Sequence, residues 1–101
     1  MNYEFRARVW EHTGGASWHF VTLPEDIADE IGERTSHLRR GFGSVKVVVA
    51  IGESRWSTSL FPDTKAGSYV LPVKKPVRLA ERIEEGDEVA ISLSVVDLDD
   101  A

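Results

Sequence analysis

The sequence contains no cysteine among its 101 residues. This absence excludes disulfide bonds, thiolate metal sites and cysteine nucleophiles, and it suits a reducing compartment. No apolar run approaches the about 20 residues that a membrane-spanning helix needs. The segment 1–8 is polar and charged, unlike a signal peptide. From these absences we expect a cytoplasmic protein without a membrane segment.

Positive charge is also scarce. Twelve Lys and Arg stand against 17 Asp and Glu, which gives a formal net charge of −5 with the three His neutral. A net negative charge opposes contact with nucleic acid phosphates, so we do not expect nucleic acid binding. The charges are uneven, because residues 34–82 carry ten basic and three acidic side chains. This block can form a binding face, or the acidic ends can fold beside it and neutralise it.

Length and composition predict one globular domain over residues 1–101. Hydrophobic residues make up 42% of the chain and charged residues 29%. Both values are close to the average for globular domains, and a chain of this length has room for one hydrophobic core.

Apolar and polar residues alternate along six segments, which is the period of a β-strand with one buried face. In the first, Tyr3, Phe5, Ala7 and Val9 alternate with charged residues. Glycine-containing turns between segments indicate hairpins. The six segments are 3–9, 17–23, 45–51, 55–61, 68–73 and 89–95.

Two short helices are predicted at about 24–33 and 75–83, because Pro24 and Pro76 suit the first turn of a helix. Many strands in so small a domain favour closure, since a closed sheet leaves no edge exposed. We therefore predict a mainly β fold, a small closed six-stranded β-barrel with two short α-helices.

The chain shows no recognisable catalytic motif. None of His12, His19 and His37 lies in a nucleophile motif, and there is no Gly-x-Ser-x-Gly segment. Clustered metal ligands, a P-loop and a dinucleotide fingerprint are also missing. We therefore predict no metal and no cofactor and name no catalytic residue. An enzyme whose site is assembled from distant strands stays an open alternative.

Basic and hydroxyl side chains predict a site for a small anionic or polar ligand. Lys74 and Arg78 are four residues apart and share a face if the helix begins near 74, beside backbone N–H groups that attract anions. Alternatively, both are solvated or pair with carboxylates in 81–88. In the predicted site, Lys and Arg neutralise charge while Ser and Tyr orient the ligand by hydrogen bonds. The predicted contacts are Arg40, Ser59, Tyr69, Lys74 and Arg78.

A protein-interaction module or homodimer is the second hypothesis. Trp10 should point away from the apolar face of its strand, beside arginines. There it either stacks on a partner or lies under a neighbouring loop. This hypothesis would use Trp10, Phe42 or a strand edge as the contact surface.

The order of several short motifs resembles a family of bacterial and archaeal proteins, domain of unknown function 1905. The resemblance implies a small closed six-stranded β-barrel with short helices, and it implies no established activity, substrate or cofactor. It covers nearly the whole chain. The motifs that carry it are Trp18-His-Phe-Val-Thr-Leu-Pro24, Arg40-Gly-Phe-Gly-Ser44, Trp56-Ser-Thr-Ser-Leu-Phe-Pro62, Tyr69-Val-Leu-Pro-Val-Lys74, Val77-Arg78 and Glu85-Gly86-Asp87.

Overall fold

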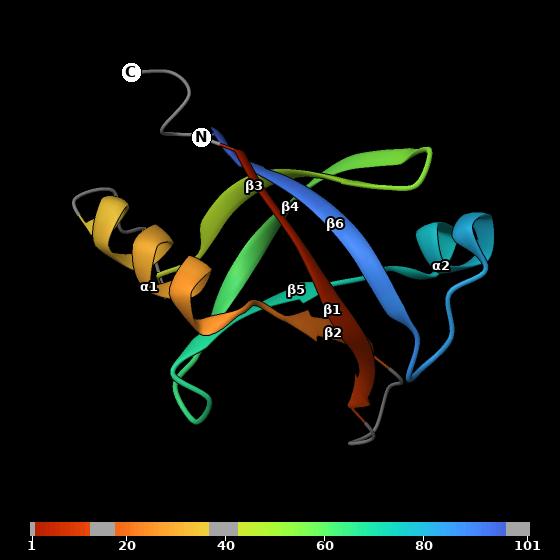
Figure 1. Ribbon diagram of the computed structural model, residues 1–101, viewed down its shortest axis with the longest axis horizontal. Helices are drawn as coiled ribbons and strands as arrows, with labels where there is room; N and C mark the ends of the chain where they lie inside the picture. The colour runs from red at the N-terminus through yellow and green to blue at the C-terminus, as the bar shows by residue number, and fades with distance from the viewer. Residues whose placement is uncertain (1, 13–17, 37–42, 97–101) are drawn as a thin grey trace.

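The computed structural model describes residues 2–12, 18–36 and 43–96. Its strands form a closed barrel in the order β1-β2-β5-β4-β3-β6, and every neighbouring pair is antiparallel. Helices α1 and α2 lie on opposite sides of the barrel (Figure 1). The predicted fold class is thereby confirmed. The elements are β1 (Asn2–His12), β2 (Trp18–Thr22), α1 (Glu25–Arg34), β3 (Val45–Ile51), β4 (Ser54–Asp63), β5 (Ser68–Pro72), α2 (Lys75–Glu81) and β6 (Glu88–Val95).

Two long strands close the barrel, because each of them pairs with a different neighbour along its two halves. The first half of β1 pairs with β6, with Phe5 opposite Ile91, and its second half pairs with β2, with Val9 opposite Val21. Strand β4 likewise pairs first with β3 and then with β5. The sheet therefore has no free edge among the described strands.

The inner face of the barrel is filled by aliphatic side chains. Strand β3 shows the alternation most clearly, since Val45, Val47, Val49 and Ile51 are buried while Lys46 is exposed. Each strand adds its own inward residues, so the core draws on the whole chain. The largest fully buried side chains are Ile31, Leu60, Leu71, Leu93, Val9, Val21, Val47, Val49, Val73 and Val95.

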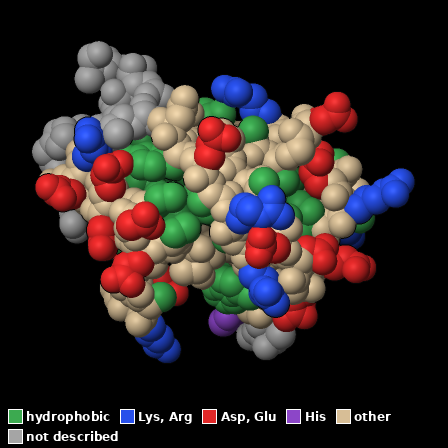
Figure 2. Space-filling view, in the orientation of Figure 1, with side chains coloured by type: hydrophobic (Ala, Val, Ile, Leu, Met, Phe, Trp, Pro, Cys, Tyr) green, Lys and Arg blue, Asp and Glu red, His purple; other side chains and the backbone are tan. Residues whose placement is uncertain are grey.

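Helix α1 covers one end of the barrel and exposes an acidic surface. Ala28 and Ile31 are its buried residues, and Figure 2 shows Asp and Glu side chains gathered over the helix. The helix ends at Thr35, whose backbone N–H and hydroxyl both donate to the carbonyl of Ile31, at 2.9 and 2.6 Å. Its bounds agree closely with the predicted 24–33.

Helix α2 is held against the β3–β4 hairpin. The hydroxyl of Ser54 donates to Oε2 of Glu81 at 2.6 Å. The helix then ends at Arg82, which adopts the left-handed conformation with φ of 56°. The predicted end at 83 was therefore too late, because a left-handed residue closes the last turn. This attachment sets the position of Lys74 and Arg78 relative to the barrel.

Strand β4 is longer than predicted. The sequence suggested a loop from Pro62 to Gly67, but Pro62 pairs with Tyr69 and Asp63 with Ser68 in the ladder between β4 and β5. The turn begins only after Asp63, whose Oδ1 accepts hydrogen bonds from backbone N–H groups of the turn. The prediction was wrong here because proline is a poor strand signal by itself, whereas β5 supplies a partner from later in the chain.

Trp10 lies on the outer face of β1, as its position in the alternation predicted, and a neighbouring strand covers it partly. Its indole N–H donates to the hydroxyl of Thr22 at 2.9 Å. Its ring packs on Phe20, with centroids 5.1 Å apart. Trp10 is therefore half-buried rather than freely exposed. Among the helices that the structure describes, none is long and apolar enough to cross a membrane.

Candidate functional site

A groove of about 390 Å³ lies where β2 begins and where β5 passes into α2. Its lining combines cationic side chains with aromatic and apolar ones. We call it the basic groove. It is lined by Trp18, His19, Pro72, Val73, Lys74, Lys75 and Arg78.

Pairing between β2 and β5 brings the two sides of this groove together. Phe20 lies opposite Pro72 in the ladder. One step further along, the backbone N–H of Val73 donates to the carbonyl of His19 at 2.9 Å. As a result, the start of β2 stands beside the segment that leads into α2, although the two are far apart in sequence.

Three cationic side chains meet at the groove. Lys74 and Lys75 are exposed and Arg78 is half-buried. The Nε–H of Arg78 donates to the carbonyl of Val73 at 3.1 Å, which ties the guanidinium to the wall of the groove. This contact uses one of the five donors of the side chain, so the others are available to an acceptor in the groove.

None of these three cations forms an ion pair with a carboxylate of the described residues. Three of the five acidic residues of 81–88 have other partners. Glu81 accepts from Ser54, and Asp87 accepts the backbone N–H of Glu84 at 2.8 Å. Glu88 pairs with Arg6 at 2.6 Å, and this hydrogen bond lowers the pKa of the Glu88 carboxyl. The alternative in which 81–88 neutralises Lys74 and Arg78 is therefore not what the structure shows.

His19 contributes a buried nitrogen to the same region. Its Nδ1 atom is buried and has no hydrogen-bond partner among the described residues. A buried polar atom without a partner is unfavourable, so such atoms are few in folded proteins.

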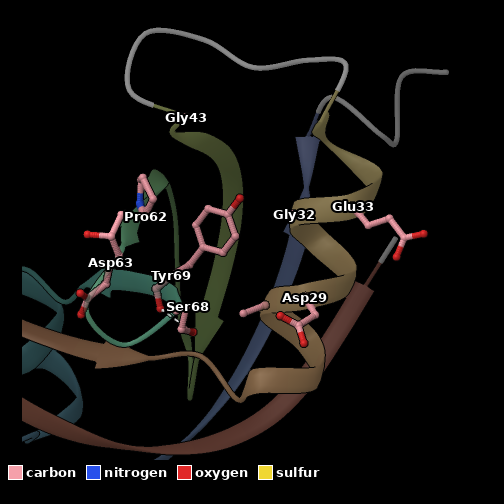
Figure 3. A pocket seen from close by; sticks show the side chains of 11 residues that line it. Asp29, Gly32, Glu33, Gly43, Pro62, Asp63, Ser68 and Tyr69 are labelled. Atoms are coloured by element: carbon pink, nitrogen blue, oxygen red, sulfur yellow. Dashed lines mark hydrogen bonds between the residues drawn. The ribbon is translucent and has the colours of Figure 1, made fainter.

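A second pocket, of about 310 Å³, lies between α1 and the turn that joins β4 to β5 (Figure 3). Tyr69 stands in it, and its hydroxyl lies near Gly32 of the helix. Asp29, Glu33 and Asp63 also line it, and none of the described residues that line it is a lysine or an arginine. We call it the acidic pocket, since its charge suits a cation rather than the anion that the sequence predicted.

The structure therefore brings together only part of the predicted site. Lys74 and Arg78 share the basic groove, whereas Tyr69 lies near the opposite end of β5, in the acidic pocket. Ser59 is half-buried on β4, paired with Lys46, and lines neither of these two sites. Arg40 and Phe42, named as contacts of a ligand and of a partner, lie outside the described residues.

The comparisons with known proteins place this barrel in a family. The family model "Domain of unknown function (DUF1905)" matches residues 5–93. The chain belongs to this family. Comparison with the curated proteins gives no match. The DUF1905 match begins within β1 and ends within β6. Every residue of the basic groove lies between these limits.

Five residues that line the groove in this DUF1905 chain were not predicted as site residues, namely Trp18, His19, Pro72, Val73 and Lys75. Lys75 adjoins Lys74, and the run of two lysines before a proline was a usable signal. Trp18 and His19 had no such signal, because only the pairing of β2 with β5 places them there. Among the described residues, no group of three or more His, Asp or Glu is arranged to hold a metal ion.

Proposed function

We propose that this DUF1905 barrel binds a small anionic ligand in the basic groove. The observation that carries the proposal is the meeting of Lys74, Lys75 and Arg78 at one groove without a described carboxylate to neutralise them. Cations left unpaired beside an apolar wall favour an anion, because the wall lowers the local screening of charge. The remaining predicted contacts are not part of this proposal: Ser59 and Tyr69 lie elsewhere, and Arg40 lies outside the described residues.

The arrangement favours a small ligand over a polyanion. The groove holds three cations, while α1 presents an acidic surface and the chain as a whole carries a net charge of −5. The net negative charge of the chain opposes contact with the many phosphates of a nucleic acid strand. A ligand with one anionic group can be satisfied by the groove alone.

The test is a titration of the ¹⁵N-labelled protein with inorganic phosphate at low ionic strength, followed by NMR and matched by a titration with chloride. We expect saturable shifts at residues 73–78 and at the indole of Trp18. In the double variant Lys74→Ala/Lys75→Ala, two exposed charge contacts of about 0.5–1 kcal/mol each are lost, so the phosphate affinity should fall about 5- to 30-fold.

The matched control is Lys46→Ala/Arg55→Ala, which removes two exposed cations from β3 and β4 and leaves the groove intact. Its phosphate affinity should match that of the unmodified protein. Shifts scattered over the surface, or an equal loss of affinity in both double variants, would show that phosphate responds only to net charge. Either result would refute the proposal.

We also propose the cytoplasm as the location of the protein. The absence of cysteine supports this, because cytosolic proteins are kept reduced and rarely depend on disulfides. Fractionation of cells that express the tagged full chain would test it, with recovery in the cytosolic fraction as the expected result.

A further inference from the structure

A second groove adjoins the basic groove on the outer face of the barrel and is almost wholly apolar. It has a volume of about 380 Å³ and crosses β2, β5 and β4. Trp18 and Pro72 line both grooves, so the two grooves adjoin at these residues. We call the second one the apolar groove. Its lining residues are His12, Trp18, Phe20, Phe61, Val70 and Pro72.

Strand pairing builds the apolar groove from outward-facing side chains. Phe20 lies opposite Pro72, and Phe61 lies opposite Val70. Trp18 and Phe61 are large hydrophobic side chains that stay 50% and 46% exposed. Exposed apolar side chains that gather in one patch, rather than lying scattered, mark a binding surface.

Aromatic rings make up much of the lining of this groove. Trp18 and Phe20 are nearly parallel, with an interplanar angle of 9° and ring centroids 6.2 Å apart, and Phe61 lines the same groove. Aromatic rings prefer offset-stacked or edge-to-face contacts at such separations. The ring of a ligand can make these contacts with the exposed parts of Trp18 and Phe61, whereas a branched aliphatic group lacks them.

We propose that the ligand of the basic groove carries an aromatic ring, and that this ring lies in the apolar groove while the anionic group contacts Lys74, Lys75 and Arg78. The inference rests on the proposed function, since it assigns the second half of the same ligand. The ligand class is an aryl anion, either an aryl phosphate or an aryl carboxylate.

The charges beside the apolar groove argue against its being covered by a second copy of the chain. A two-fold contact places the same patch on both partners. Wherever such a contact brings the two adjoining basic grooves together, their like charges repel each other and make the contact unfavourable. An aryl anion avoids this cost, because it brings its own opposite charge.

The experiment compares three probes by isothermal titration calorimetry, using the full chain. The probes are 1-naphthyl phosphate, inorganic phosphate and the neutral 1-naphthol. We expect 1-naphthyl phosphate to bind at least tenfold more tightly than either of the others, because only it fills both grooves. A parallel titration with 1-naphthoate distinguishes a phosphate from a carboxylate as the preferred anionic group.

The variant Phe61→Ser tests the apolar groove separately, since Phe61 does not line the basic groove. It should lower the affinity for 1-naphthyl phosphate to that for inorganic phosphate and leave phosphate binding unchanged. Leu79→Ser is the matched control, because Leu79 is 69% exposed and lines neither groove. In the unmodified protein, saturation transfer between the naphthyl protons and the rings of Trp18 and Phe61 provides a readout that needs no variant.

Each other outcome has a distinct meaning. If 1-naphthyl phosphate binds no more tightly than phosphate while phosphate still shifts residues 73–78, the aryl inference is wrong and the proposed function stands. If neither anion binds, the proposed function itself fails. If 1-naphthol binds as tightly as 1-naphthyl phosphate, the apolar groove binds neutral rings and the aryl-anion inference is wrong. If sedimentation equilibrium shows a dimer that Phe61→Ser dissociates, a second copy of the chain occupies the groove and the inference is also wrong.

Discussion

Replacing Gly32 by alanine should stabilise the protein. Gly32 lies in the last turn of α1, two residues before the helix ends at Arg34, and its φ is not positive. Glycine in a helix interior is about 0.8–1 kcal/mol less favourable than alanine, because glycine loses more backbone freedom on folding. The gain is realised only if the structure has room for a methyl group at this position.

The surroundings of Gly32 provide that room. A Cβ atom at this position would lie 3.6 Å from the hydroxyl of Tyr69 and 3.8 Å from Cε2 of the same ring. These are ordinary van der Waals separations, so the methyl group packs on the tyrosine without displacing it. We therefore expect Gly32→Ala to raise the free energy of unfolding by about 1 kcal/mol, which for a domain of this size corresponds to about 4–8 °C in Tm.

The assay is thermal unfolding followed by far-UV circular dichroism, with urea unfolding as a second measurement. Gly52→Ala is the control of opposite sign. Gly52 has φ of +58°, and a Cβ there would lie 1.9 Å from Oε1 of Glu81. That variant should lose about 1 kcal/mol or more. If Gly32→Ala instead lowers Tm, or if both variants shift Tm in the same direction, the reasoning from φ and local space is wrong.

Two further predictions concern the end of α2 and the start of β1. Arg82 holds a left-handed conformation that glycine adopts without strain. Arg82→Gly should therefore raise the free energy of unfolding, measured in urea, by up to about 1 kcal/mol. A clear loss of stability would show that the contacts of the arginine side chain contribute more than the backbone strain costs. Burial, together with a hydrogen bond to Glu30, raises the pKa of Tyr3 from 10.0 to about 12. The unfolded chain therefore releases this proton first, and stability should fall as the pH rises from 10 to 12, with a smaller fall in Tyr3→Phe. An equal fall in both proteins would contradict the assignment.

The elements of this fold could be predicted from the sequence because their signals are local. Alternation such as that of residues 45–51 depends only on neighbouring positions, and the barrel followed because closure removes the edges of so many short strands. The errors fell at element ends. Arg82 ends α2 early by adopting a left-handed conformation, and Pro62 extends β4 because it pairs with Tyr69 of β5.

The set of residues that line the candidate site depends partly on spacing along the chain and partly on contacts between segments far apart in sequence. Lys74 and Arg78 are close in sequence, and their spacing alone indicated that they would act together. Tyr69 is five residues from Lys74 along the chain, nearly as close as Arg78, yet the two line different sites because they lie toward opposite ends of β5. The sequence by itself thus determined the strands, the helices and the pair of cations, because these follow from spacing along one segment. Only the tertiary structure decided that Trp18 joins the cations and that Tyr69 does not, because strand register is set by core packing around the whole barrel.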